Sequence, residues 1–168
     1  MRQLLLLRHA KAAAAAADPG RRLSPAGRLA ALAMRSVMRD LSLVPDLVLV
    51  SPSRRTLETL EALEPWDDTP LIETIDSLYL ATAPRLLAVL NDVAETVRSV
   101  LLIGHNPGLA ELASALAVGV TADREAARRL AEGFPTAALA EFSVPGPWGL
   151  LVPSAARLVR MIRPRDLA

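Results

Sequence analysis

The stretch LLLLRHAK, residues 4–11, decides the fold. Four consecutive leucines are apolar on both faces of an extended chain, which is typical of a strand buried within a parallel sheet. Arg8 and His9 follow at once, where such a strand would end. In an open α/β sheet, ligands bind outside the carboxyl ends of the strands. The stretch therefore predicts a central strand and, at its end, a functional site.

The same plan recurs twice further along the chain. DLVLV (residues 46–50) precedes SPSRRTLETLEAL, and SVLLI (residues 99–103) precedes GHNPGLAELASAL. Each pair indicates a buried strand followed by an amphipathic helix. The first strand should likewise lead into a helix, through a small-residue loop over residues 12–20. Each helix is expected to start with a capping residue and a proline: Ser24 with Pro25, Ser51 with Pro52, and Asn106 with Pro107.

Helical spacing also predicts which side chains of these three helices pack against the sheet. Residues three or four positions apart lie on the same face of a helix, so apolar residues at that spacing form a stripe. The expected stripes are Leu29, Ala33 and Val37 in the first helix; Leu57, Leu60 and Leu63 in the second; and Leu109, Leu112, Ala113 and Leu116 in the third.

The remaining elements complete an α/β fold. A weaker strand is expected at residues 71–73, a helix at 84–94, and a hairpin from strands 137–144 and 158–162 around the turn-rich VPGPWG. Residues 121–132, charged and helix-prone, are expected to form a surface excursion. Buried strands alternating with helices predict a mainly parallel sheet covered on both sides, here with an antiparallel edge. With no repeat and no linker, residues 1–168 should form a single domain.

Composition narrows the class of protein. The formal net charge is +1 and only 3% of residues are aromatic, so we expect no nucleic-acid partner. The leucine run is too short for a signal peptide, and no apolar run is long enough to cross a membrane. Cysteine is absent, which excludes disulfides and fits a reducing compartment. We therefore expect a cytoplasmic protein with no membrane partner, and we favour a monomer.

The candidate site combines histidines with arginines. The chain has only two histidines, and each lies just after an expected strand: His9, beside Arg8, and His105, beside Asn106. Arg54 and Arg55 fall near the start of the second helix, and spacing alone leaves open which of them faces the site. Arginine forks match phosphate oxygens, and a neutral histidine is a nucleophile. These residue types together favour phosphoryl transfer, with His9 attacking phosphorus.

Other chemistries lack their motifs. No G-x-x-x-x-G-K-[ST] or G-x-G-x-x-G is present, which excludes a P-loop and a dinucleotide fingerprint. HExxH is absent, and Arg8 and Arg55 would repel a cation, so we expect no metal and no cofactor. Neither Ser51 nor Ser53 lies in a G-x-S-x-G nucleophile elbow.

Four motifs in order resemble the histidine phosphatase superfamily, and most of all its small SixA-like phosphohistidine phosphatases. They are LLLLRHAKA, RRLSPAGRLAA, VLVSPSRRTLETL and LLIGHNPGL, and the closing RLVRMIRPRDL is also similar. The resemblance covers nearly the whole chain. It implies a three-layer α/β/α sandwich that needs no metal. It also implies that His9 is the nucleophile, that Arg8 and Arg55 clamp the phosphate, and that His105 is the partner histidine.

Two positions depart from the superfamily pattern. Ala10 replaces the glycine that usually follows the histidine. Many members also carry an acid that protonates the leaving group. Glu73 and Asp76 are weak candidates for it, and Ser77 is expected to occupy its position. A missing acid would favour a phosphoramidate, whose leaving nitrogen needs less help than an alkoxide.

The expected function is a phosphatase acting on phosphohistidine in a protein through a phosphorylated His9. Arg8, Arg55, His105 and Asn106 would bind the phosphoryl group. One alternative is a phosphatase for a small phosphomonoester, and another is a non-catalytic, regulatory phosphate-binding domain. Lys11, Arg21 and Arg22 either line the mouth of the pocket, favouring an acidic partner surface, or are ordinary solvated charges.

Overall fold

The computed structural model describes residues 1–14, 18, 20–119 and 122–167. In this part of the chain, six strands form one sheet in the order β3-β2-β4-β1-β5-β6. The first four in that order run parallel, and β5 and β6 run antiparallel to their neighbours, which confirms the antiparallel edge. The strands are β1 (Arg2–Arg8), β2 (Leu47–Val50), β3 (Leu71–Thr74), β4 (Ser99–Gly104), β5 (Leu139–Val144) and β6 (Arg157–Ile162).

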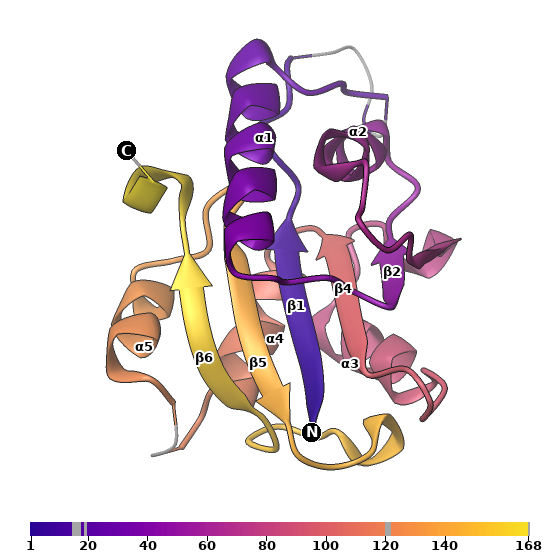
Figure 1. The fold of residues 1–168 in the computed structure, drawn as a ribbon, viewed down its shortest axis with the longest axis vertical. Helices are drawn as coiled ribbons and strands as arrows, with labels where there is room; N and C mark the ends of the chain where they lie inside the picture. Colours follow the sequence, from indigo (N-terminus) through magenta and orange to yellow (C-terminus); the bar gives the residue numbers. More distant parts are fainter. Residues whose placement is uncertain (15–17, 19, 120–121, 168) are drawn as a thin grey trace.

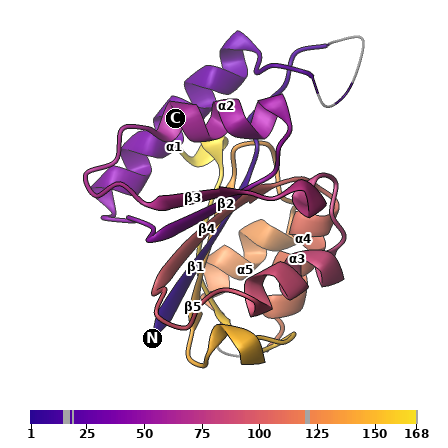
Figure 2. The ribbon, with the colours of Figure 1, turned by 90° about the vertical axis from the view of Figure 1, so that its right-hand side faces the viewer.

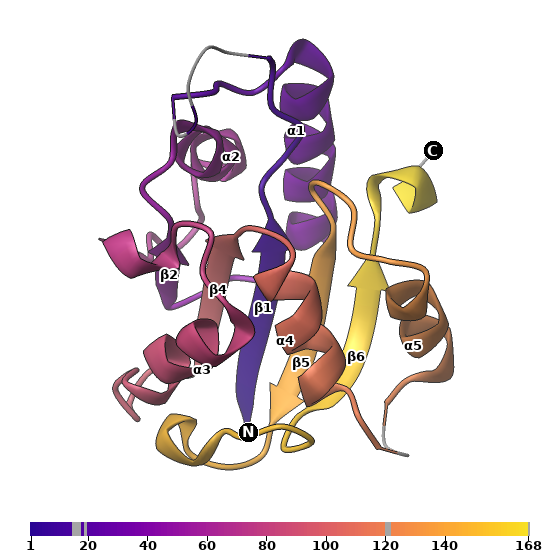
Figure 3. The same ribbon diagram turned by 180° about the vertical axis from the view of Figure 1, so that it is seen from behind.

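Helices cover both faces of this sheet, so the predicted three-layer α/β/α fold is confirmed. One face carries α1 and α2, and the other carries α3, α4 and α5 (Figure 2). Figure 3 views the molecule from behind and shows α3, α4 and α5 in front of the sheet. The helices are α1 (Pro25–Asp40), α2 (Arg54–Leu63), α3 (Ala83–Asn91), α4 (Gly108–Leu116) and α5 (Arg124–Ala131), and short 3-10 turns lie at η1 (Asp76–Leu78), η2 (Trp148–Leu150) and η3 (Pro164–Leu167).

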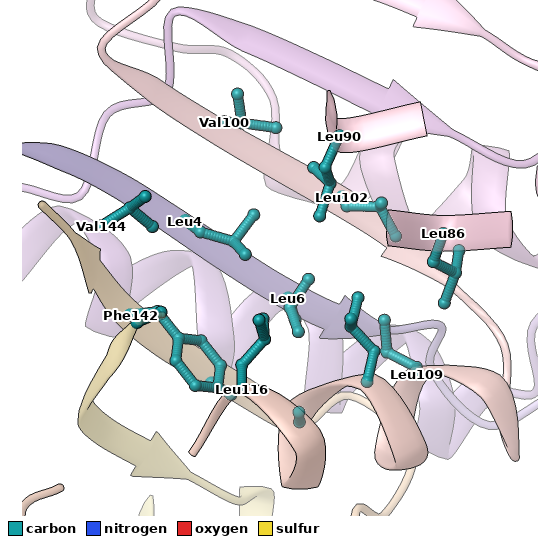
Figure 4. Close-up of a cluster of buried hydrophobic side chains, with 14 of the residues drawn as sticks. Leu4, Leu6, Leu86, Leu90, Val100, Leu102, Leu109, Leu116, Phe142 and Val144 are labelled. Carbon is teal, nitrogen blue, oxygen red and sulfur yellow. The ribbon is translucent and has the colours of Figure 1, made fainter. Parts of the chain in front are cut away.

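The leucine run lies at the centre of the molecule as β1, flanked by β4 and β5 (Figure 1). Leu4 and Leu6 point to the face covered by α3 and α4, where Leu102 and Phe142 pack beside them (Figure 4). Leu5 and Leu7 point to the face of α1 and α2. All four are almost fully buried, and each contributes roughly 1.5–3 kcal/mol of transfer free energy. This burial holds the end of β1, and the residues after it, in a fixed position.

The buried face of α1 differs from the predicted stripe. Leu29 is 69% exposed, and the face that packs is formed by Gly27, Ala31, Met34 and Met38. The cause is a close backbone contact at Gly27, whose missing side chain lets α1 approach the main chain of Lys11. That contact sets the rotation of the helix, and the apolar spacing does not reveal it.

Two helices start later than predicted. Ser53, not Ser51, caps α2, and its Oγ accepts a hydrogen bond from the N–H of Thr56. The helix α4 begins at Gly108, after Pro107. The stripe of α4 is buried as expected, whereas Leu57 of α2 is 38% exposed. Ser51 is therefore not needed as a cap, and its hydroxyl is available for a contact elsewhere in the fold.

The charged segment expected as a surface excursion is a packed amphipathic helix. Ala126 and Leu130 of α5 are buried in the core, and the helix contacts β6. Arg129 also donates a hydrogen bond of 3.0 Å to the carbonyl of Met161 in β6. The predicted helical tendency is therefore confirmed for 124–131, but the predicted surface excursion was wrong. Residue 121 of the predicted excursion, and residues 15–17 and 19 of the predicted 12–20 loop, lie outside the described residues.

Gly27→Ala is expected to destabilise the fold. A Cβ there would overlap the carbonyl oxygen of Lys11 and lie 2.9 Å from its nitrogen, so main chain must shift. Such overpacking costs about 1–3 kcal/mol. The free energy of unfolding from urea denaturation measures it. Gly146→Ala is the matched control, because a Cβ there meets nothing within 4 Å. Equal stability of the two variants would contradict this role of Gly27.

Candidate active site

The two histidines lie side by side at the carboxyl edge of the sheet. They follow β1 and β4, which are adjacent parallel strands paired up to Arg8 and Gly104. The N–H of His9 continues that ladder with a bond of 3.1 Å to the carbonyl of Gly104. The ring centroids of His9 and His105 are 5.4 Å apart. Strand order thus brings together residues that are far apart in the sequence.

Arg55 lies between the two rings. Its Nε donates to Nε2 of His9 at 3.3 Å, and its Nη2 donates to Nδ1 of His105 at 3.1 Å. Arg55 is 4% exposed, whereas Arg54 is exposed and pairs with Glu58 at 2.8 Å. The structure therefore settles which arginine faces the site.

Thr59 fixes the main chain around Arg55 and His9. Its buried Oγ1 donates to the carbonyl of Arg55 at 2.7 Å and accepts from the N–H of Ala10 at 3.0 Å. One side chain thereby ties the first turn of α2 to the residue after the histidine. This threonine lies within the motif VLVSPSRRTLETL, four residues after Arg55 and on the same face of the helix, but the sequence alone assigned it no role.

His9 is held as a neutral imidazole with a defined tautomer. Its Nδ1–H donates to the carbonyl of Ala10 at 2.7 Å, so the lone pair is on Nε2, which faces Arg55. Burial, with the charges of Arg55, Arg8 and Arg21, lowers the pKa of His9 to about 4, although the hydrogen bond to Ala10 opposes this. At neutral pH, Nε2 is an unprotonated nitrogen that faces a cation.

His105 has the opposite tautomer. Its Nε2–H donates to Oγ of Ser51 at 2.7 Å, which leaves Nδ1 to accept from Arg55. Ser51 is fully buried, and this contact explains why it does not cap α2. Burial and the charge of Arg55 lower the pKa of His105 to about 3. Ser51 is a second residue whose role the sequence did not reveal.

Histidine titration should report both environments, because the chain has only two histidines. With histidine labelled in the ring, NMR is expected to show neutral rings throughout the neutral range, with titration only as the pH approaches about 4 and about 3. Since the unfolded imidazoles take up protons first, near their ordinary pKa of about 6.5, stability should fall as the pH decreases from 6.5 towards 4. Titration of either ring near 6.5 in the folded protein would contradict this electrostatic account.

Arg8 is half-buried beside the histidines, and part of its guanidinium is available. Its Nη1 donates to the carbonyl of Phe134 at 3.1 Å, whereas its Nε is buried without a partner among the described residues. Burial and the nearby charge of Arg55 lower its pKa. Asn106 also lines the pocket, but its Nδ2 donates to the same carbonyl at 2.8 Å and its Oδ1 accepts from the N–H of Ala110. These two bonds give Asn106 a positioning role in the wall.

Asp18 and Tyr79 also belong to the site, although the sequence analysis named neither of them. The Asp18 carboxylate accepts hydrogen bonds from both terminal nitrogens of Arg55 and from the Tyr79 hydroxyl. The hydrogen bond from Tyr79, together with Arg55, lowers the pKa of Asp18. The Tyr79 ring packs edge-on to His105, with centroids 5.4 Å apart. The carboxylate thus holds the donors of Arg55 that an oxyanion would use.

Asp18→Asn is expected to tighten binding of inorganic phosphate. The carboxylate competes with an incoming anion for Arg55, and removing its charge should raise the affinity about fivefold, as for a partly exposed ion pair. Calorimetric titration with phosphate measures the change. Asp76→Asn is the control, because Asp76 is exposed and the carboxylate bonded to Arg55 is that of Asp18. Weaker binding in Asp18→Asn would show that Asp18 helps to hold the anion instead.

Three comparisons relate the chain to known proteins. No family model matches it. An uncharacterized protein of Mycobacterium tuberculosis is 35% identical over 162 residues, which are 95% of this chain and 100% of that protein. A protein assigned as the phosphohistidine phosphatase SixA of Nakamurella multipartitia has TM-score 0.86 and 30% identity, over 97% of this chain and 96% of that one. The protein histidine phosphatase SixA complexed with tungstate has TM-score 0.81 and 26% identity, over 99% of each chain. This chain belongs to the SixA-like phosphatases of the histidine phosphatase superfamily.

Family membership confirms the resemblance read from the four motifs. Gly27, within the motif RRLSPAGRLAA, is the residue whose missing side chain lets α1 approach the main chain of Lys11. Lys11 and Arg21 line the pocket of this SixA-like phosphatase, which has a volume of about 340 Å³, and Arg22 does not. The weak candidates for a general acid, Glu73 and Asp76, and also Ser77, are not among the lining residues.

Two further properties bear on what the site of this SixA-like phosphatase could hold. No cluster of three or more His, Cys, Asp or Glu side chains suited to a metal ion occurs among the described residues. The charged residues that line the pocket around His9 are instead cations, and these suit an anionic ligand: Arg8, Lys11, Arg21 and Arg55. Within the same described part of the chain, no helix is long and apolar enough to cross a bilayer.

Proposed function

We propose that this SixA-like phosphatase hydrolyses phosphohistidine on a protein through a phosphorylated His9. The observation that carries the proposal is the unprotonated Nε2 of His9, set by the Nδ1–H bond to Ala10 and facing the guanidinium of Arg55. A nucleophile and an oxyanion donor therefore meet at one point. A non-catalytic phosphate-binding domain would not need such a fixed tautomer, whereas a phosphomonoester phosphatase would, so the leaving group must separate the two phosphatase alternatives.

In the first step, Nε2 of His9 attacks phosphorus in line with the leaving nitrogen. The new N–P bond forms while the substrate N–P bond breaks, and that electron pair passes to the leaving imidazole nitrogen. Arg55 and Arg8 hold the equatorial oxygens, on which the charge is concentrated. For Arg55 to do so, the phosphoryl group must displace the carboxylate of Asp18.

In the second step, water attacks phospho-His9. The phosphorus–oxygen bond forms and the bond to Nε2 breaks, so the electron pair returns to Nε2, and His9, a cation while phosphorylated, becomes neutral again with its hydrogen on Nδ1. Both protons of the water leave with inorganic phosphate. No change in the tautomer of His9 is required, because Ala10 accepts the same hydrogen bond throughout.

The leaving group indicates the substrate class. Among the described residues that contact Arg55, the carboxylate is Asp18, and its lowered pKa keeps it ionised at neutral pH. An ionised carboxylate gives no proton to a departing alkoxide. An imidazole of the substrate, protonated at its other nitrogen, leaves as a neutral molecule without help. The site therefore suits a phosphoramidate better than a phosphomonoester.

Substrate profiling tests this proposal. Turnover of a phosphohistidine peptide is compared with turnover of phosphoserine, phosphotyrosine and small sugar phosphates at equal concentration. We expect the phosphohistidine peptide to have the highest kcat/KM by about hundredfold, the usual contribution of a general acid that phosphomonoesters would lack here. Preference for one phosphomonoester would support the small-molecule alternative. Phosphate binding without turnover of any substrate would support a regulatory domain.

A further inference from the structure

A groove continues from the catalytic pocket across the molecule. It has a volume of about 640 Å³, against about 340 Å³ for the pocket, and the two share Arg8, Lys11, Asn106 and Thr136 in their walls. Beyond these shared residues, the groove runs between the start of α1, the loop over residues 132–136, and η3. Figure 1 shows this short C-terminal helix beside α1. When a phosphoryl group is bound at His9, the groove is the space open to the rest of the substrate that carries it.

The apolar part of the groove is a wall of small side chains. Ala26 and Ala30 of α1 face Pro135 and Pro164 across it. Phe134 also contributes to the lining, but it is only 4% exposed. Small side chains of this kind leave room for a polypeptide backbone with short side chains.

The charged part of the groove is basic. Its lining contains four cations and one carboxylate, Glu132. Glu132 is already bonded to Arg163 at 2.6 Å and to Arg165 at 3.2 Å, so its charge is compensated. The side chain of Arg165 is nevertheless 62% exposed, and Lys11 has no ion-pair partner among the described residues. The surplus charge facing a ligand in the groove is therefore positive.

We propose that this groove binds an acidic segment of the substrate protein next to its phosphohistidine. The inference rests on the proposed function, because the segment must belong to the chain that carries the phosphoryl group. Two features select this occupant: the groove is continuous with the pocket, and its free charges are complementary to aspartate and glutamate. Charges at the rim of such a surface govern specificity and encounter more than catalysis.

The test uses two peptides. One has a single histidine flanked by glutamates and alanines, and its twin has glutamine in place of each glutamate. For the phosphorylated pair, the wild type should prefer the acidic peptide in kcat/KM by about tenfold, the effect of one to two rim charges. Arg165→Glu should remove most of that preference. Hydrolysis of phosphoimidazole, which cannot reach the groove, should stay within about twofold of wild type, as for an ordinary surface substitution.

A second variant tests the groove without the structural strain that Arg165→Glu could introduce. Arg165→Glu places two carboxylates together at Glu132, whereas Ala26→Glu adds an acidic side chain in the first turn of α1, where the helix dipole favours it. Ala26→Glu should lose the acidic preference in the same way. Arg98→Glu is the matched control, since Arg98 is exposed and precedes β4, at the opposite end of the sheet from the pocket. It should keep the wild-type preference.

Binding separates the groove from the chemistry. Fluorescence anisotropy of the labelled, unphosphorylated acidic peptide should show binding to the wild type and to Arg98→Glu, weakened about tenfold in Arg165→Glu and Ala26→Glu. Equal binding by all four proteins, or no binding by the wild type, would overturn the groove assignment. Failure to hydrolyse phosphohistidine, with this pattern of binding intact, would instead count against the proposed function alone.

Discussion

His9→Ala is expected to lower the single-turnover rate on a phosphohistidine peptide about ten-thousand-fold, the usual consequence of removing a covalent nucleophile. The ring nitrogen that would attack phosphorus is lost, while Arg8 and Arg55 remain to bind the phosphoryl group. Affinity for inorganic phosphate should therefore change little. Rapid-quench kinetics and a phosphate titration of the same preparation measure the two quantities.

His105→Ala is the control for this first result. It removes the ring that accepts a hydrogen bond from Arg55 but leaves the nucleophile, so its rate should fall by only about hundredfold, as when one transition-state contact, here that of Arg55, is disturbed. A His9→Ala variant that turned over within about tenfold of wild type would contradict nucleophilic catalysis by His9. A His105→Ala variant slower than His9→Ala would point to His105 as the nucleophile.

Arg55→Lys is expected to lower kcat/KM about a thousandfold, in the range seen when a cationic clamp on a transferring phosphoryl group is lost. Lysine keeps the charge but loses the fork that reaches both histidine rings and the anion site. The stability of the fold should change less than the rate. The hydrogen bond that the Thr59 hydroxyl donates to the carbonyl of Arg55 does not involve the guanidinium and is kept in the variant.

Arg54→Lys is the matched control for Arg55→Lys. The two arginines are adjacent on α2, but Arg54 is exposed and bonded to Glu58. Its replacement should leave kcat/KM within about twofold of wild type, as for other surface substitutions. Steady-state kinetics of both variants on the same peptide would show the contrast. Equal losses would contradict the placement of Arg55 as the clamp.

The sheet could be predicted from the sequence because its signal is local. Three apolar runs, each followed by polar residues and a helical pattern, require buried parallel strands, and parallel strands bring their carboxyl ends to one edge. The meeting of His9 with His105 follows from that rule once their strands are neighbours. Arg55 could be separated from Arg54 only by resemblance to the family, because both occupy the first turn of α2.

The residues that the sequence did not reveal act through contacts between distant parts of the chain. Asp18 reaches Arg55 and Tyr79 from a loop, and no spacing in the sequence relates these three positions. Ser51 was expected to cap a helix because serine before proline is typical of a helix start. Its hydroxyl instead accepts a hydrogen bond from the buried ring of His105. In each case a tertiary hydrogen bond outweighs the local preference on which sequence reasoning depends.

The packing of α1 gives the same lesson for the fold. Leu29 looked like a core residue by spacing, but the approach of Gly27 to Lys11 rotates the helix and leaves that leucine 69% exposed. The helix α5 shows the reverse case. Its many charges suggested a surface excursion, while two apolar residues among them, Ala126 and Leu130, suffice to pack it against the sheet.

The most direct test of the central claim is to trap the covalent intermediate. The wild type and His9→Ala are mixed with a phosphohistidine peptide, quenched early in base and analysed by intact mass. The account predicts a transient adduct of one phosphoryl group on the wild type, stable to base, labile to acid and absent from His9→Ala. An adduct that persists in His9→Ala, or turnover of the peptide by the wild type with no adduct at any time, would contradict it.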